Sequence, residues 1–222
     1  MKIIQNLVSS DKYSIKCPHS MTPQYITIHN TANDASAANE VAYMIRNDNK
    51  VSFHVAVDDV QAVQGVSFNR NAWHCGDGGT GTGNRKSIGI EICYSKSGGT
   101  RYDNAVKNAI ELTAELMHRF NIPASKIVYH KHWNGKHCPH RLIDSGVDVE
   151  TFRKSVQLRY DKLFKGDQTM QKDNTPDKYA KEAVEWAVKE GILNGDQNGN
   201  YMLHSNVTRQ DLLVFLHNAL KK

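Results

Sequence analysis

The sequence of 222 residues lacks any long apolar run. Its N-terminal stretch, MKIIQNLVSSDKYS, has no apolar segment of the length that a secretory signal requires, and no later stretch approaches the length of a membrane span. We therefore expect neither membrane insertion nor export by a signal peptide. Synthesis would leave the chain in the cytoplasm unless something else exports it.

Cysteine is scarce as well, and a nucleic-acid-binding stripe is missing. The four cysteines are irregularly spaced in a chain too large to need a disulfide framework, so we expect reduced thiols, one of which can be a metal ligand. No basic run has interleaved aromatic residues, which argues against nucleic-acid binding. Residues 172–222 hold seven basic and seven acidic groups, so the net charge of +5 lies in residues 1–171. This mild positive charge favours approach to an anionic polymer such as a bacterial wall.

Hydrophobic patterning predicts an α/β domain. Four segments have the β-branched residues or the alternation of strands: residues 24–29, 51–57, 87–94 and 127–129. Three segments have helical spacing: residues 35–46, 103–120 and 148–164. Asp34 is a candidate cap for the first helix, and the five glycines of HCGDGGTGTGN predict an irregular loop. The order of these segments predicts a mixed central β-sheet flanked by helices.

A change in composition divides the chain. Apolar residues almost vanish over residues 165–174, as in a linker, so we place the first domain at residues 1–164 and a second module at residues 175–222. The second module has two helical patterns around a turn-rich stretch, GDQNGN. Its core is small, so we expect little stability from this module alone.

Two histidines at predicted strand ends, with a nearby cysteine, suggest a metal centre. His29 ends the first strand, His130 follows the strand at 127–129, and Cys138 lies eight residues later in a loop. Three such ligands leave the fourth position of zinc open, which is the arrangement of catalytic zinc sites. We therefore choose these three residues as the metal ligands.

Other histidines of the stretch YHKHWNGKHCPH compete with this choice. His132 would point to the opposite face if the strand continued past His130. His137 is adjacent to Cys138, which is a poor spacing for joint ligation, and His140 is a further candidate. A closed structural site with four ligands, or surface histidines without a metal, remain open alternatives.

Five motifs stand in a characteristic order: ITIHNTAN from Ile26, SFHVAVDD from Ser52, WHCG from Trp73, NRKSIGIEIC from Asn84 and HKHWNGKHCPH from His130. Together they resemble the zinc-dependent N-acetylmuramoyl-L-alanine amidases of phage and prophage endolysins, a family that also includes the peptidoglycan recognition proteins. The resemblance covers about residues 1–160. It implies the same mixed sheet flanked by helices, and one Zn²⁺ per chain bound by His29, His130 and Cys138.

The resemblance also implies an activity, the hydrolysis of the amide between N-acetylmuramic acid and the L-alanine of the stem peptide, which lyses the cell wall. In this family the residue that matches Lys136 is catalytic, and in Bacillus-type lysins so is a glutamate at the position of Glu91. Some relatives have a tyrosine where this chain has Phe53, and its loss shifts the role of the base to Glu91. We expect Glu91 to carry the proton and Lys136 to stabilise the oxyanion. The alternatives are a solvated strand carboxylate and an ordinary surface lysine.

Four further residues are candidates for binding the substrate. Trp73 and His74, ahead of the glycine-rich stretch, can form walls for glycan or peptide, or can simply pack locally. His54 either lines the pocket or is a hydrogen-bonded, half-buried histidine. Asn84 is the fourth candidate.

Residues 175–222 resemble an S-layer homology motif, with a tryptophan on the first helix, GIL before NG, and VTRQD at the start of the last helix. Such modules bind secondary polysaccharides of Gram-positive cell walls. The resemblance implies that Arg209 meets an anionic sugar substituent and that Trp186 packs on sugar or lies in the core. Binding usually involves three tandem motifs, whereas this chain has one. We therefore expect wall targeting, either through assembly of several chains or through weak binding by the single module, against the alternative of a helical cap without a ligand.

Three classes of protein follow from these residues. The first is a hydrolase that waits in the host cytoplasm and acts on bacterial peptidoglycan in the cell wall after release. The second is a peptidoglycan recognition protein that binds without cutting, and the presence of Glu91, Lys136 and Cys138 favours the hydrolase over it. The third, a zinc-stabilised structural protein, would need a fourth ligand.

Overall fold

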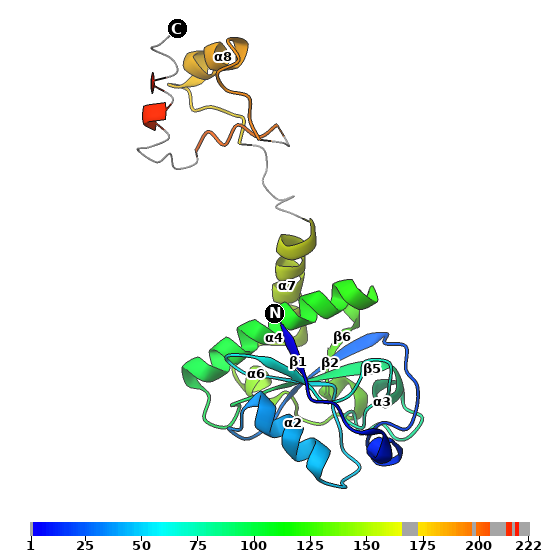
Figure 1. Cartoon of the computed structure of the whole chain (residues 1–222). Coiled ribbons are helices and arrows are strands. Elements are labelled where there is room, and N and C mark those ends of the chain that lie inside the picture. Colours follow the sequence, from blue (N-terminus) through cyan, green and yellow to red (C-terminus); the bar gives the residue numbers. More distant parts are fainter. Residues whose placement is uncertain (1, 166–172, 197–198, 205–211, 215, 218–222) are drawn as a thin grey trace. The chain divides into compact units, whose positions relative to one another are not determined.

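The computed structural model describes residues 2–165, 173–196, 199–204, 212–214 and 216–217. The chain divides into two compact units, residues 1–166 and 167–222 (Figure 1). Most of the predicted linker, residues 166–172, lies outside the described residues. Among the residues that the structure covers, no helix is both long enough and apolar enough to cross a membrane.

The first unit is built on one six-stranded sheet with the order β1-β4-β3-β5-β2-β6. The strands are β1 (Ile3–Gln5), β2 (Tyr25–Asn30), β3 (Val55–Val57), β4 (Ala62–Gln64), β5 (Ser87–Ile92) and β6 (Ile127–Tyr129). Strands β3 and β4 pair antiparallel, and the other neighbours pair parallel. The predicted fold class, a mixed sheet flanked by helices, is therefore confirmed.

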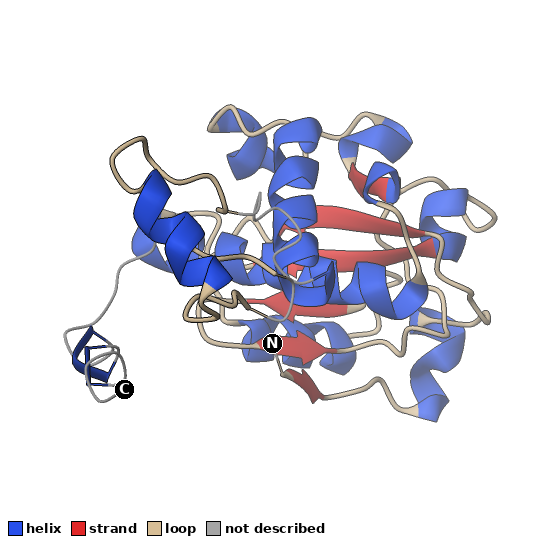
Figure 2. Cartoon of the chain, turned by 90° about the horizontal axis from the view of Figure 1, so that it is seen from above, coloured by secondary structure: helices blue, strands red, loops and turns tan. Residues whose placement is uncertain are grey.

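Helices surround this sheet (Figures 1 and 2). The helices of the first unit are α1 (Tyr13–Lys16), α2 (Ala37–Arg46), α3 (Thr82–Lys86), α4 (Gly99–Phe120), α5 (Lys131–Asn134), α6 (His140–Asp144) and α7 (Val149–Tyr160). Short 3₁₀ turns cover Ser10–Lys12 and Ala124–Lys126, and a π-helical turn, Asp161–Lys165, follows α7. The predicted helices at 103–120 and 148–164 correspond to α4 and to α7 with this turn.

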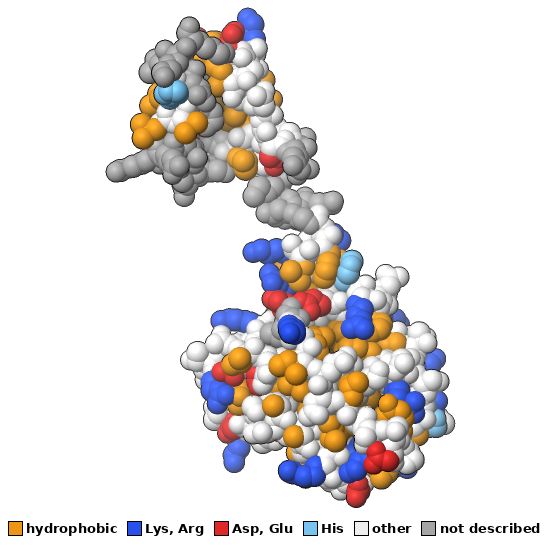
Figure 3. Space-filling model, in the orientation of Figure 1, with side chains coloured by type: hydrophobic (Ala, Val, Ile, Leu, Met, Phe, Trp, Pro, Cys, Tyr) orange, Lys and Arg blue, Asp and Glu red, His pale blue; other side chains and the backbone are white. Residues whose placement is uncertain are grey.

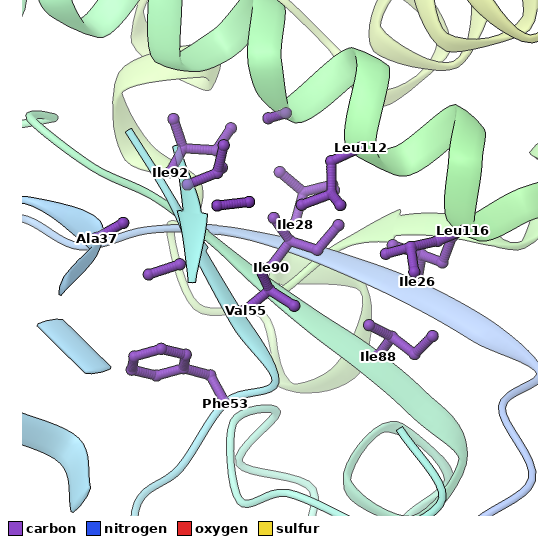
Figure 4. Close-up of a cluster of buried hydrophobic side chains, with 14 of the residues drawn as sticks. Ile26, Ile28, Ala37, Phe53, Val55, Ile88, Ile90, Ile92, Leu112 and Leu116 are labelled. Carbon is purple, nitrogen blue, oxygen red and sulfur yellow. The ribbon is translucent and has the colours of Figure 1, made fainter. Parts of the chain in front are cut away.

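Alternation along β2 and β5 separates the core from the polar face of the sheet. Figure 4 shows one set of side chains gathered below α4: Ile26, Ile28, Ile88, Ile90, Ile92, Leu112 and Leu116. All of them are at most 1% exposed, and burial of each contributes about 1.5–3 kcal/mol. Because successive strand residues point to opposite faces, His29 and Glu91 lie on the face away from α4.

Three local predictions need correction. The first helix is capped by Ser36, whose Oγ accepts a hydrogen bond from Asn39 N, while Asp34 instead accepts from the backbone and hydroxyl of Ser97. The strand expected at 51–57 begins only at Val55, because Ser52 N donates to the Trp73 carbonyl instead of continuing the β3 pairing. The glycine-rich stretch is not wholly irregular, since α3 starts within it. Patterning also missed the three-residue strands β1 and β4.

The described part of the second unit includes the helix α8 (Lys181–Lys189). Hydrophobic side chains remain exposed on this unit (Figure 3), with Tyr179 89% and Trp186 56% accessible. His204 Nδ1 lies 2.5 Å from Asp173 Oδ1 and ties the described C-terminal part of the unit to its beginning. Arg209 lies outside the described residues.

Candidate metal centre and active site

A cleft of ≈ 590 Å³ opens on the polar face of the sheet. Its walls come from the ends of β2 and β5, the segment 50–53, the glycine-rich stretch and the segment 130–138. Eight of the candidate site residues singled out from sequence line it: His29, Trp73, His74, Asn84, Glu91, His130, Lys136 and Cys138. The fold therefore brings the predicted catalytic and metal-binding residues into one cavity.

The three predicted ligands lie close together at the ends of β2 and β6. Nδ1 of His29 is 3.1 Å from Nδ1 of His130 and 3.8 Å from Sγ of Cys138, and all three residues are buried. Strand pairing positions them, because His130 N donates to the Ile28 carbonyl at 3.3 Å. The loop then returns, and Lys131 N donates to the Cys138 carbonyl at 3.0 Å.

These separations fit a tetrahedral zinc ion. Zinc–nitrogen bonds of about 2.05 Å and zinc–sulfur bonds of about 2.3 Å place two nitrogens about 3.3 Å apart and a nitrogen about 3.6 Å from a sulfur. The observed distances of 3.1 and 3.8 Å lie within about 0.3 Å of these edges. Nε2 of His130 is buried and has no hydrogen-bond partner, so its ring is not held by the protein alone. The donor set can therefore bind zinc with three ligands.

Burial and neighbouring groups lower the pKa of both imidazoles, which favours the neutral form that binds a metal. Burial, followed by the neighbouring histidines, lowers the pKa of His29 well below its usual range, and burial with the charge of Lys136 lowers the pKa of His130. Both rings are therefore neutral and keep a lone pair for a metal. Burial raises the pKa of Cys138 to about 11, and a bound cation would favour its thiolate.

A second group of donors, His29 with His74 and Cys75, lies beneath the first. His29 Nε2 is 2.9 Å from His74 Nδ1, and Cys75 Sγ is 3.2 Å from the same atom. Both separations are about 0.4 Å shorter than a zinc tetrahedron requires. Cys75 is fully buried and does not line the cleft. The set of His29, His130 and Cys138 is therefore the better metal site.

Glu91 and Lys136 stand beside this centre. Glu91 is paired with His29 across β5 and β2, and its Oε2 atom is buried without a hydrogen-bond partner. Burial and then the charge of Glu40 raise the pKa of Glu91 to about 8, whereas Lys136 acts in the opposite direction. Lys136 is exposed and lines the same cleft. The site thus combines a buried carboxyl group and an exposed ammonium group in one cleft with three atoms that could hold a metal ion.

The other predicted substrate residues fall into two groups. Trp73 forms a wall of the cleft, fixed by a 2.9 Å hydrogen bond from its Nε1 to the Ile15 carbonyl. His74 and Asn84 also line the cleft, but their polar atoms bond to the protein, and Asn84 Oδ1 accepts from the backbone of His74 and Cys75. His54 is fully buried and outside the cleft, with Nδ1 accepting from Gly89 N and Nε2 donating to the Arg70 carbonyl.

The competing histidines lie elsewhere. His132 lines a separate pocket of ≈ 440 Å³, and exposed His137 bonds to Asp144 at 2.8 Å. His140 borders a third pocket beside Arg141. Sequence reasoning missed Lys50, which lines the cleft with its Nζ 5.8 Å from the centre of the Trp73 ring, because nothing in the sequence brings segment 50–53 to the strand ends.

The sequence profile of the family N-acetylmuramoyl-L-alanine amidase matches residues 19–141, which is more than half of the chain and includes every residue of the metal centre. The chain belongs to this amidase family. A second profile, the S-layer homology domain, matches residues 172–213 of the same chain.

Relatives of this amidase-family chain come from Bacillus. It is 58% identical over 153 residues to the N-acetylmuramoyl-L-alanine amidase CwlA of Bacillus subtilis (strain 168), a match that covers 68% of this chain and 56% of CwlA. It is 56% identical over 142 residues to XlyB of the same strain, covering 64% of this chain and 45% of XlyB. The chain therefore spans about half the length of these two relatives.

Solved structures show the same catalytic fold. The structure of PlyL superposes with a TM-score of 0.68 at 55% identity, covering 70% of this chain and 97% of PlyL. The catalytic domain of XlyA superposes with a TM-score of 0.63 at 40% identity, covering 70% of this chain and 99% of that domain. The first unit thus corresponds to a whole amidase catalytic domain.

Proposed function

We propose that this chain hydrolyses the amide between N-acetylmuramic acid and the L-alanine of the peptidoglycan stem peptide, with one Zn²⁺ held by His29, His130 and Cys138. The observation that carries this proposal is the close approach of three buried donors, all within 4.8 Å of one another, beside Glu91 and Lys136 in one cleft. Membership of the amidase family and the names of the relatives support it.

Zinc bound by these ligands supplies a Lewis acid for the amide carbonyl and lowers the pKa of water. The carboxylate of Glu91 accepts the proton of the attacking water and delivers it to the amine nitrogen as the C–N bond breaks. A pKa above the usual range of a carboxyl suits a group that first accepts and then donates a proton. The Lys136 ammonium stabilises the oxyanion that forms on the former carbonyl oxygen.

Trp73 and Lys50 line the cleft together with the proposed metal ligands, and we propose that they contact the glycan or the stem peptide. His54 is better explained as a packing residue, since both of its ring nitrogens are used by backbone atoms. His74 and Asn84 line the cleft but act within the protein.

Substitution of a metal ligand tests this function. The wild type should bind one zinc ion per chain and release new L-alanine amino termini from peptidoglycan, whereas Cys138→Ser should bind no zinc and release none. Cys17→Ser is the matched control, because Cys17 is 1% exposed and does not line the cleft. A wild type that binds purified wall without releasing termini would instead be a peptidoglycan recognition protein, and the roles of Glu91 and Lys136 would be withdrawn.

For the second unit we propose binding to a secondary cell-wall polysaccharide through Arg209 and Trp186. The match to the S-layer homology domain and the exposed indole of Trp186 support this. Arg209→Ala and Trp186→Ala in the full chain should reduce sedimentation with Gram-positive walls and leave binding to polysaccharide-stripped peptidoglycan unchanged. Equal sedimentation of all three chains would contradict the proposal. Analytical ultracentrifugation of the same proteins would test whether several chains assemble through this unit. Binding by this unit would place the enzyme at the cell wall.

A further inference from the structure

A buried chain of hydrogen bonds extends from the metal centre into the sheet. His29 Nε2 is 2.9 Å from His74 Nδ1, and His74 Nε2 is 3.2 Å from the carbonyl oxygen of Ser87. His29 and His74 are 2% and 8% exposed, and Ser87 is fully buried, so water does not compete for these contacts. The sequence suggested a substrate contact for His74, but its polar atoms face inward.

The Ser87 carbonyl, at the end of this series of hydrogen bonds, determines which ring nitrogen of each histidine carries the proton. A carbonyl oxygen can only accept, so His74 must carry its proton on Nε2. The Nδ1 atom of neutral His74 is then an acceptor, and the bond to His29 requires a proton on His29 Nε2. Neutral His29 therefore has a free lone pair on Nδ1, the atom that lies 3.1 Å from His130 Nδ1 and 3.8 Å from Cys138 Sγ.

We propose that His74 is a positioning residue, which fixes the tautomer and the ring orientation of His29 so that Nδ1 is presented to the metal. The inference depends on the proposed zinc centre but not on peptide cleavage. Partners of this kind typically change metal affinity by about 10–100-fold.

The glycine-rich stretch holds His74 in this position. Asn84 Oδ1 accepts from His74 N at 2.9 Å, and the Asp77 carboxylate in turn accepts from the backbone of Gly83 at 2.6 Å and of Asn84 at 3.1 Å. Gly89 provides the space for the ring, since a Cβ there would lie 2.7 Å from His74 Nδ1. The WHCG and NRKSIGIEIC motifs thus combine to place one imidazole behind the metal ligand.

Two replacements by amides test the hydrogen bond of His74 to His29 separately from its hydrogen bond to the Ser87 carbonyl. In His74→Asn the amide oxygen can occupy the place of Nδ1 and still accept from His29. In His74→Gln the longer amide reaches the Ser87 carbonyl but leaves no acceptor for His29. His74→Ala removes both bonds, and Thr113→Ala is the control, because it removes a buried hydrogen bond within α4 on the other face of the sheet.

The first readout is zinc affinity by chelator competition, measured without substrate. The Kd should rise about 10–100-fold in His74→Ala and His74→Gln and only about threefold in His74→Asn. Thr113→Ala should lower the melting temperature while its Kd stays that of the wild type. An unchanged Kd in His74→Ala, or His74→Asn as weak as His74→Ala, would overturn the proposal.

The second readout is the ring-nitrogen NMR spectrum of the zinc-free protein. His29 in the wild type and in His74→Asn should show a proton on Nε2 alone, and His74→Ala should show a mixture of both tautomers. A proton on Nδ1 of His29 in the wild type would also refute the role of His74. If the wild type bound no zinc, the proposed metal centre would fail, and this spectrum would still decide whether His74 sets the tautomer.

Discussion

His29 and Glu91 occupy the same register position on the adjacent parallel strands β2 and β5. Neighbouring strands lie about 4.8 Å apart, so the proposed metal ligand and the carboxylate stand side by side on one face of the sheet. The residues just before them, Ile28 and Ile90, pack on the opposite face below α4. A shift of one residue in either strand would exchange a catalytic side chain for an isoleucine. The hydrophobic core therefore fixes the geometry of the site.

Glu91→Gln should reduce hydrolysis about 10²–10⁴-fold, because the amide has nearly the same shape but cannot carry the proton. Zinc content should remain at one ion per chain, since the three ligands are intact. The measurement is the rate of release of L-alanine amino termini together with metal analysis. Glu150→Gln on α7, an exposed carboxylate, is the matched control. An active Glu91→Gln enzyme would remove the proton-carrying role from Glu91.

Lys136→Met should lower kcat about 10²–10³-fold while leaving KM and zinc content nearly unchanged, because the cation is needed mainly when the oxyanion forms. Kinetics with soluble muropeptides would separate the two parameters. Lys131→Met is the control, because Lys131 is exposed and borders the separate pocket of His132. A rise in KM alone would show that Lys136 binds the substrate and does not stabilise the transition state.

Lys16→Met should destabilise the first unit by roughly 2–4 kcal/mol. Lys16 is fully buried, and its Nζ donates to Asn47 Oδ1 at 2.9 Å and to the carbonyls of Asn49 at 2.6 Å and Val51 at 3.2 Å. Methionine fills the space but removes the donor to the carbonyls of Asn49 and Val51, whereas Asn47 Oδ1 still accepts from Asn49 N. Denaturant unfolding of the zinc-free protein would measure the loss.

Lys12→Met provides the comparison for this prediction. Lys12 also donates to carbonyls, of Ile45 and Arg46, but its side chain is 24% exposed and its partner Asp48 is largely in water. We expect a loss below about 1 kcal/mol there. Equal losses in the two variants would mean that burial of the Lys16 ammonium is not important for stability.

The pair of His204 and Asp173 should make the stability of the second unit depend on pH. The hydrogen bond to Asp173 raises the pKa of His204, and the hydrogen bonds from His204 lower the pKa of Asp173. The histidine contribution is fully present below the unfolded pKa of 6.5 and is lost as pH rises through the higher folded pKa. The aspartate contribution is present above 3.8 and is lost as pH falls through the lower folded pKa.

NMR titration of the His204 ring checks this prediction. The wild type should titrate above 6.5, and Asp173→Asn should return the pKa of His204 toward that value. A wild-type pKa at or below 6.5 would show that the pair does not form in solution.

Much of the fold follows from local patterning. The strands β2 and β5 and the helix α4 could be predicted because their apolar residues recur at the period of the element. The short strand β6 could be predicted because all three of its residues are β-branched or aromatic. The strands β1 and β4 could not, since three residues do not establish a period. Asp34 was chosen as a cap from its residue type, but Ser97, distant in sequence, takes its carboxylate. Whether a side chain caps its own helix or bonds to a distant residue depends on which groups the folded chain brings close to it.

The sequence by itself determined the amidase family of this protein and named its candidate metal ligands. The order of the five motifs pointed to the family, and the strand-end histidines with the following cysteine were the candidates, because both depend on residue identity and spacing. The tertiary structure alone decided which atoms meet. It separated His74 from His54, two buried histidines that look alike in sequence, by placing one against His29 and the other against backbone groups. Hydrogen-bond partners are distant in sequence and become fixed only when the strands pair.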